Sequence, residues 1–100
     1  MALSGDYGKP RPAVVVQEDA AAGLATIVVC PITSTQRADL PDFRIEIAPN
    51  DRNGLEVTSY VMIDKPSVLL KEKLGRSIGR LSGNEMAEVS SALAVLLGLV

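Results

Sequence analysis

The 100-residue sequence contains no histidine and no tryptophan, and it has a single cysteine, Cys30. Without histidine, neither a Ser-His-Asp nor a Cys-His catalytic centre can form. Zinc in proteins is held mainly by cysteine and histidine, so we expect no metal site and no cofactor. One cysteine cannot form an internal disulfide, which favours a reducing compartment, the cytosol. Any enzyme built from this chain must therefore use carboxylates, hydroxyls, lysine and arginine.

Long apolar runs are also missing. No run approaches the ~20 residues that a membrane-spanning helix needs. No basic segment followed by an apolar stretch opens the chain, as a signal peptide would. Apolar residues nevertheless make up 47% of the sequence, which excludes a disordered protein. A chain of this length builds one core, so we expect a single domain over residues 1–100 with no membrane partner.

The net charge of -2 is small, but the charges are unevenly distributed. Residues 83–100 contain two acids and no base. Residues 64–80 contain two acids and five bases, namely Lys65, Lys71, Lys73, Arg76 and Arg80. A basic stretch beside an acidic and apolar tail is compatible with a polyanionic partner, and equally with an ordinary solvated surface.

Short β-branched runs dominate the first three quarters of the chain. Phe43, Ile45 and Ile47 alternate with charged residues, which predicts a half-buried strand with these three side chains inward. Turn-forming residues fill 1–12, which we expect to be mostly loop. The predicted strands or β-rich segments cover residues 13–17, 26–30, 43–47, 55–63, 68–70 and 76–81.

The C-terminal segment has the clearest pattern. Ser82 and Glu85 match a capping box, with serine at the N-cap and glutamate three residues later. Apolar residues then follow at helical spacing, and a helix is predicted over 83–97. They are Met86, Val89, Leu93, Leu96 and Leu97. The fold class is mainly β within α+β, a small twisted antiparallel sheet or SH3-like barrel closed by a C-terminal helix.

Motifs spread in order over nearly the whole chain resemble the MazF/PemK family of toxin endoribonucleases. The opening motifs are Lys9 to Gln17 and Ile27 to Ser34, and the middle ones are Gly54-Leu55, Ser59 and Asp64-Lys65-Pro66. The closing ones are Ile78 to Ser82, Met86 and Leu97-Gly98-Leu99. The resemblance implies a CcdB/PemK-like fold and the toxin component of a type II toxin–antitoxin system. It further implies sequence-specific, ribosome-independent and metal-independent cleavage of single-stranded RNA by attack of the ribose 2′-OH. The expected partners are single-stranded RNA, a cognate antitoxin with a flexible tail, and a second copy in a homodimer.

Two residues match catalytic positions of the family, and a neighbouring residue is a further candidate. Arg11, between two prolines, matches the catalytic arginine, and its planar guanidinium suits a phosphate. Its pKa is too high for easy proton donation, which favours charge stabilisation over general acid catalysis. Thr33 matches the family's threonine, whose hydroxyl can donate to a phosphate oxygen. Ser34, beside it, is a further candidate.

Two aspartates are candidates for the base that takes the 2′-OH proton. Asp6 lies five residues before Arg11, where family members often carry a glutamate. Asp64 matches the acid that some members use. Met62 and Ser67 replace basic residues that some members carry around this acid, which favours the pair of Asp6 and Arg11. Both aspartates have a structural alternative as turn residues.

Basic and aromatic residues are expected to hold the RNA. We assign phosphate contacts to Lys9, Lys65, Lys71, Lys73 and Arg76, and base stacking to Tyr7. Cys30 is expected to be a small core residue.

One further departure from the family and two alternative functions remain open. The family's first strand is longer than Met1-Ala2-Leu3, so we expect a truncated N-terminal strand. The first alternative is a CcdB-like toxin that binds gyrase without nuclease activity. The second is a catalytically inactive interaction module.

Overall fold

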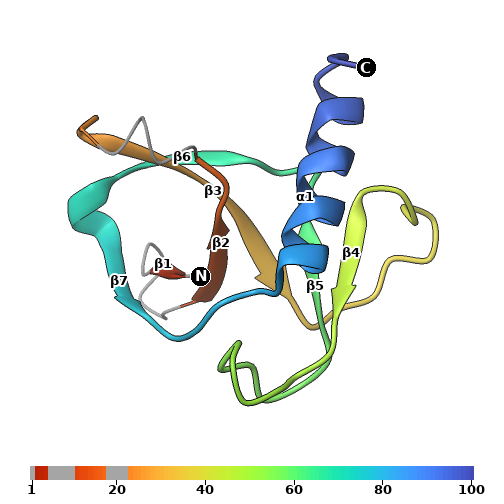
Figure 1. Ribbon diagram of the computed structural model, residues 1–100, viewed down its shortest axis with the longest axis horizontal. Helices are drawn as coiled ribbons and strands as arrows, with labels where there is room; N and C mark the ends of the chain where they lie inside the picture. The colour runs from red at the N-terminus through yellow and green to blue at the C-terminus, as the bar shows by residue number, and fades with distance from the viewer. Residues whose placement is uncertain (1, 5–10, 18–22) are drawn as a thin grey trace.

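The computed structural model describes residues 2–4, 11–17 and 23–100 of the chain (Figure 1). Within these ranges a twisted antiparallel sheet is followed by one helix. The strands are β1 (Ala2–Ser4), β2 (Arg11–Val15), β3 (Thr26–Thr33), β4 (Arg44–Ile47), β5 (Ser59–Met62), β6 (Ser67–Leu70) and β7 (Leu74–Ser77), and the helix is α1 (Gly83–Leu96). A single 3₁₀ turn, Lys71–Lys73, joins β6 to β7.

β3 organises the sheet. Its eight residues pair with β2 along one edge, and with β6 and then β5 along the other, all antiparallel. The strand order is β4-β5-β3-β2-β1-β7, with β6 attached to β3. Among the described strands, the terminal β4 and β7 do not pair with each other. Of the two predicted forms, the sheet is therefore the open one and not the barrel.

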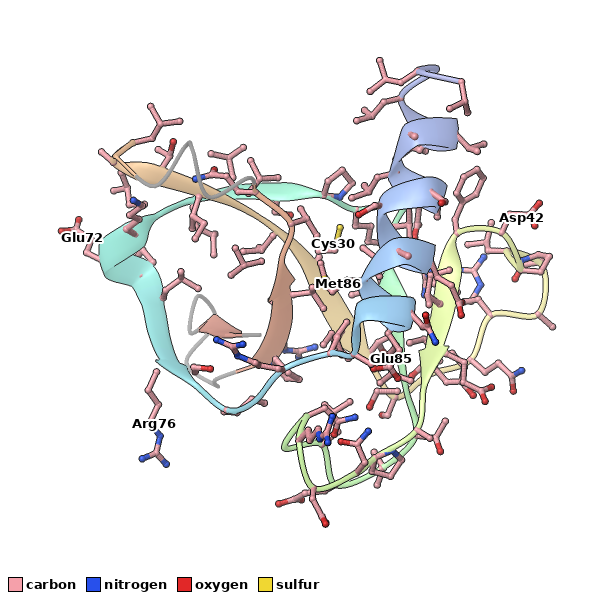
Figure 2. The ribbon with its side chains drawn as sticks, in the orientation of Figure 1. Cys30, Asp42, Glu72, Arg76, Glu85 and Met86 are labelled. Carbon is pink, nitrogen blue, oxygen red and sulfur yellow. The ribbon has the colours of Figure 1, made fainter. Side chains whose placement is uncertain are left out.

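The core lies between the sheet and the first turns of α1. Val14, Cys30, Ile47 and Val61 come from four strands, and Val89 from the helix, and all five are at most 1% exposed. Figure 2 shows Cys30 and Met86 between the helix and the strands. The prediction that Cys30 is a core residue is confirmed, and burial raises the pKa of its thiol to about 11.

The predicted capping box starts α1. The Ser82 hydroxyl accepts a hydrogen bond from the Glu85 N–H at 3.1 Å, and the Glu85 carboxylate accepts one from the Ser82 N–H at 2.8 Å. The helix ends at Leu96, one residue before the predicted end. Leu96 and Leu97 are exposed by 37% and 61%, although their spacing places them on the apolar stripe. Figure 1 shows the reason, because the last turns of α1 extend beyond the strands.

The inward face of the 43–47 segment is as predicted. Ile47 is fully buried, and Phe43 and Ile45 pack against the core. The strand itself begins one residue later, at Arg44.

The prediction of a mostly looped N-terminus is wrong at two places. Residues Ala2–Ser4 form β1, which pairs with β2 on one side and with β7 on the other. Arg11 and Pro12 already belong to β2. A three-residue strand is too short to show an alternating pattern in the sequence. Backbone hydrogen bonds to the two neighbouring strands stabilise it instead.

Other strand limits also differ from the prediction, with β2 ending at Val15 and β6 beginning at Ser67. β3 continues past residue 30 to Thr33, because β5 supplies it with a partner there. The segment 55–63 is a strand only from Ser59 to Met62. The predicted strand at 76–81 is found at Leu74–Ser77, and Gly79 then packs against the backbone of residues 52 and 53.

Candidate active site

A hollow of about 580 Å³ lies where β2 begins and β3 ends. The register of these strands pairs Ala13 with Pro31. Continued by two residues, this register brings Arg11 opposite Thr33. Arg11, Thr33, Ser34 and Glu56 are among the residues that line the hollow. The structure thus brings together three of the predicted catalytic residues: Arg11, Thr33 and Ser34.

The turn that precedes β5 forms another wall of the hollow. Asn53, fully buried, holds this turn: its Oδ1 accepts hydrogen bonds from the N–H groups of Asn50 and Leu55, and its Nδ2 donates to the Ala48 carbonyl at 2.8 Å. Gly54 has φ +67, and a Cβ there would lie 2.1 Å from the Ile78 carbonyl oxygen. Only glycine meets both conditions, so the family motif Gly54-Leu55 has a structural cause.

Two polar side chains of the hollow have donors available for a ligand. Arg11 is exposed, and within the described ranges its guanidinium forms no ion pair. The Thr33 Oγ1 accepts a hydrogen bond from the Thr35 N–H at 3.1 Å. Because this contact uses a lone pair, the hydroxyl hydrogen of Thr33 remains available to a ligand. A cation and a hydroxyl donor therefore face the same space, which suits an anion such as phosphate.

Asp64 has a different setting. It does not line the hollow, and Arg44 holds it through two hydrogen bonds, Nε to Oδ1 at 2.9 Å and Nη2 to Oδ2 at 3.2 Å. The Arg44 side chain is 6% exposed and that of Asp64 22% exposed. The guanidinium holds the pKa of the Asp64 carboxyl below its ordinary value. A carboxylate with a lowered pKa is a weaker base, and this one is already bound.

The predicted RNA-binding lysines and arginine lie away from the hollow. Lys65 follows β5, and its Nζ is 3.9 Å from the carboxylate of Asp64. Lys71 and Lys73 lie in the 3₁₀ turn, and Arg76 lies on β7. Figure 2 shows Arg76 pointing outward from the sheet. None of these four side chains lines the hollow.

Three predicted site residues, Asp6, Tyr7 and Lys9, lie outside the described residues. Their assignments stay predictions.

Glu56 is a residue of the hollow that sequence reasoning missed. It lies two residues after Gly54, in the turn that leads to β5, and its side chain is exposed. The available signal was its position directly after the Gly54-Leu55 motif. A single exposed glutamate in a turn carries no pattern of its own, so only the fold shows that it lines the same hollow as Arg11 and Thr33.

Two features are absent from the described ranges, a metal-binding cluster and a membrane-spanning helix. No group of three or more Cys, Asp or Glu side chains there is placed to hold a metal ion. No helix there is long and apolar enough to cross a membrane.

Fold and site together define a small α+β protein whose open antiparallel sheet carries a hollow suited to an anionic group. Comparison with known proteins makes this more specific. The model of the PemK-like, MazF-like toxins of type II toxin–antitoxin systems matches residues 2–97, and the chain belongs to this family.

Relatives and solved structures agree with the assignment. The chain is 38% identical over 99 residues to the "Probable endoribonuclease MazF" of Mycolicibacterium smegmatis, covering 98% of this chain and 90% of that protein. It is 33% identical over 104 residues to "Endoribonuclease MazF9" of Mycobacterium tuberculosis, covering 98% and 86%. A solved mycobacterial endoribonuclease in complex with its cognate antitoxin superposes with a TM-score of 0.81 at 27% identity, covering 99% of this chain and 91% of that one.

Proposed function

We propose that this toxin is an endoribonuclease that cleaves single-stranded RNA at a specific short sequence, without a ribosome or a metal ion. The observation that carries the proposal is the β2–β3 register, which joins Arg11 and Thr33 in one hollow. Two relatives that are named endoribonucleases support it. They also favour a nuclease over the CcdB-like gyrase binder and the inactive module.

The reaction begins when a ribose 2′-OH attacks the adjacent phosphorus. The phosphate then gains negative charge on its non-bridging oxygens, and the exposed guanidinium of Arg11 stabilises this charge. The Thr33 hydroxyl donates to a phosphate oxygen, and Ser34 supplies a neighbouring hydroxyl. The products are a 2′,3′-cyclic phosphate and a 5′-hydroxyl end.

Asp6 and Asp64 are the sequence candidates for the base. The contact with Arg44 argues for a structural role of Asp64, because its carboxylate accepts two hydrogen bonds outside the hollow. The other predicted RNA-binding residues do not line the hollow, so their proposed contacts are with RNA phosphates outside it. They are Lys65, Lys71, Lys73 and Arg76. For the two residues outside the described ranges, phosphate contact is proposed for Lys9 and base stacking for Tyr7.

The proposed protein partners are an antitoxin and a second copy of the chain. The solved relative that is bound to its cognate antitoxin supports the first. The homodimer is supported by the apolar end of the chain, where Val95, Leu97, Leu99 and Val100 are exposed by 56%, 61%, 72% and 91%. Exposed apolar side chains that lie together favour a protein interface.

The proposal is tested by incubating the purified protein with a long single-stranded RNA of mixed sequence in excess EDTA. We expect cuts that recur at one short sequence and leave 5′-hydroxyl ends. An oligonucleotide with a 2′-deoxyribose at the cut position is the matched control, and it should stay intact because the nucleophile is missing.

Two results would contradict the proposal. A strict requirement for Mg²⁺ would reject the metal-independent reaction. Intact RNA together with gyrase-dependent DNA breaks would support the gyrase-binding alternative.

A further inference from the structure

The hollow contains a carboxylate that the proposed reaction has not yet used. Glu56 lines it together with Arg11, Thr33 and Ser34. Arg11 and Thr33 come from β2 and β3, whereas Glu56 comes from the turn before β5. Among the described residues that line the hollow, Glu56 is the one acidic side chain.

From this position we infer that Glu56 is the general base that takes the proton of the attacking 2′-OH. The inference rests on the proposed ribonuclease function. In-line attack needs a proton acceptor within reach of the ribose while the cation holds the phosphate. The carboxylate of Glu56, from a turn, and the guanidinium of Arg11, from β2, line one hollow and can supply these two functions.

The contacts of Glu56 within the described residues support the role. Within the described residues, Glu56 has no hydrogen bond and no ion pair, although Arg11 lines the same hollow. The two groups are therefore not joined to each other, and each is free to contact a different part of the substrate. Asp64, in contrast, is occupied by Arg44.

The backbone on both sides of Glu56 is fixed. On one side, the buried Asn53 accepts a hydrogen bond from the Leu55 N–H at 3.0 Å. On the other, the buried Ser59 donates from Oγ to the Val57 carbonyl at 2.9 Å. These two contacts hold the main chain at residues 55 and 57, and so they fix the point at which the exposed Glu56 side chain leaves the backbone.

The reaction step needs no additional reagent other than water. The 2′-oxygen forms its bond to phosphorus while its proton moves to the Glu56 carboxylate. The bond from phosphorus to the 5′-oxygen breaks, and a water molecule protonates the leaving oxygen. The hydroxide formed from that water takes the proton back from Glu56, which returns the carboxylate to its starting state.

The test compares Glu56→Gln with the wild type on an oligonucleotide that contains the mapped cleavage sequence. Glutamine keeps the shape and removes the basic oxygen. We expect kcat to fall about 10²-fold, with KM unchanged. The rate of the wild type should rise with pH over its acid limb, and this limb should be absent in Glu56→Gln.

Matched variants separate the base from other roles. Glu72→Gln is the control, because Glu72 is an exposed glutamate in the 3₁₀ turn, far from α1 (Figure 2), and it does not line the hollow. It should leave kcat and the pH profile unchanged. Asp6→Asn and Asp64→Asn should keep the acid limb. Binding of the uncleavable 2′-deoxy oligonucleotide should be equal for Glu56→Gln and the wild type.

Each contrary outcome has a distinct meaning. If Glu56→Gln keeps both its rate and its acid limb, or if Asp6→Asn alone loses the limb, the inference fails while the ribonuclease proposal stands. If Glu56→Gln cuts at the same rate but at a different sequence, Glu56 reads the RNA bases and is not the base catalyst. If the wild type cuts no RNA, the proposed function itself fails.

Discussion

Arg11 and Arg44 are both arginines at the start of a strand, but they differ in burial and in ion pairing. Arg44 is almost fully buried and binds Asp64 through two nitrogen atoms. Arg11 is exposed at the rim of a hollow and has no ion pair within the described ranges. The comparison teaches that the partners of a charge, and not its chemical type, separate a structural arginine from one that can bind a ligand.

The physical basis is desolvation. Taking a guanidinium out of water is unfavourable unless a carboxylate and its hydrogen bonds replace the lost solvent. Asp64 does this for Arg44, so neither group has capacity left for RNA. Arg11, in contrast, is exposed to solvent, and in the proposed reaction the phosphate of the RNA replaces that solvent.

The largest effect is expected from Arg11→Ala. Removal of the one cation of the described hollow should lower kcat/KM for RNA about 10³-fold, because the charge on the phosphate is no longer stabilised. Stability should hardly change, because the side chain is exposed. Cleavage assays and urea unfolding measure the two quantities on the same preparation.

Arg37→Ala is the matched control for this variant. Arg37 is another exposed arginine, already paired with Asp39 at 2.7 Å, and it does not line the hollow. Its loss should leave cleavage unchanged. An active Arg11→Ala protein, or an equal loss in both variants, would remove the distinction between free and paired arginines.

The second effect is on stability. Arg44→Met removes the hydrogen-bond partner of the partly buried Asp64 carboxylate, which within the described residues keeps only the distant Lys65 Nζ, at 3.9 Å, as an ion-pair partner, and should reduce the free energy of unfolding by about 3 kcal/mol. The double variant Arg44→Met/Asp64→Leu should regain part of this loss, because no charge then remains unpaired. Urea unfolding measures both, and the activity of the folded fraction should stay near that of the wild type.

That last measurement keeps the catalytic assignment of Asp64 testable. If Asp64→Leu in the stable double variant removes RNA cleavage while the protein stays folded, Asp64 takes part in the reaction as the sequence alone suggested.

The smallest effect is the pH dependence of the same pair. The pKa of Asp64 is lower in the folded protein than its ordinary value of 3.8, chiefly because Arg44 donates hydrogen bonds to it. The stabilisation is therefore fully present above pH 3.8 and is lost as the pH falls through the folded-state pKa. The difference in unfolding free energy between wild type and Asp64→Asn should be constant near neutral pH and shrink in acid. A difference that grows in acid would contradict the assignment.

Much of the fold could be predicted because local signals agreed with tertiary structure. The capping box at Ser82 and the alternation around Ile45 depend on neighbouring residues, and both were confirmed. β1 could not be found this way, because three residues acquire strand geometry only from pairing with β2 and β7. The exposure of Leu96 depends on where the sheet ends, which no helical pattern contains.

The residues of the site likewise fall into those that the sequence predicts and those that it does not. Arg11 and Thr33 stand at the ends of recognisable strands, so an antiparallel pairing is sufficient to join them. Arg44 and Asp64 are 20 positions apart, and their contact requires the register of β4 with β5. Glu56 is placed by a buried asparagine and a glycine contact with residue 78. Such contacts have no sequence period, so the carboxylate of the hollow was not found.

The amide of Asn53 also has an evolutionary consequence. It holds the ends of its turn through main-chain groups, and so it imposes no particular side chain on positions 56 to 58. These three side chains are exposed and contribute nothing to the core. Substitutions at Val57 and Thr58 can therefore accumulate without loss of folding, and under the proposed function such changes beside the hollow are a route to new RNA sequence preferences on an unchanged scaffold.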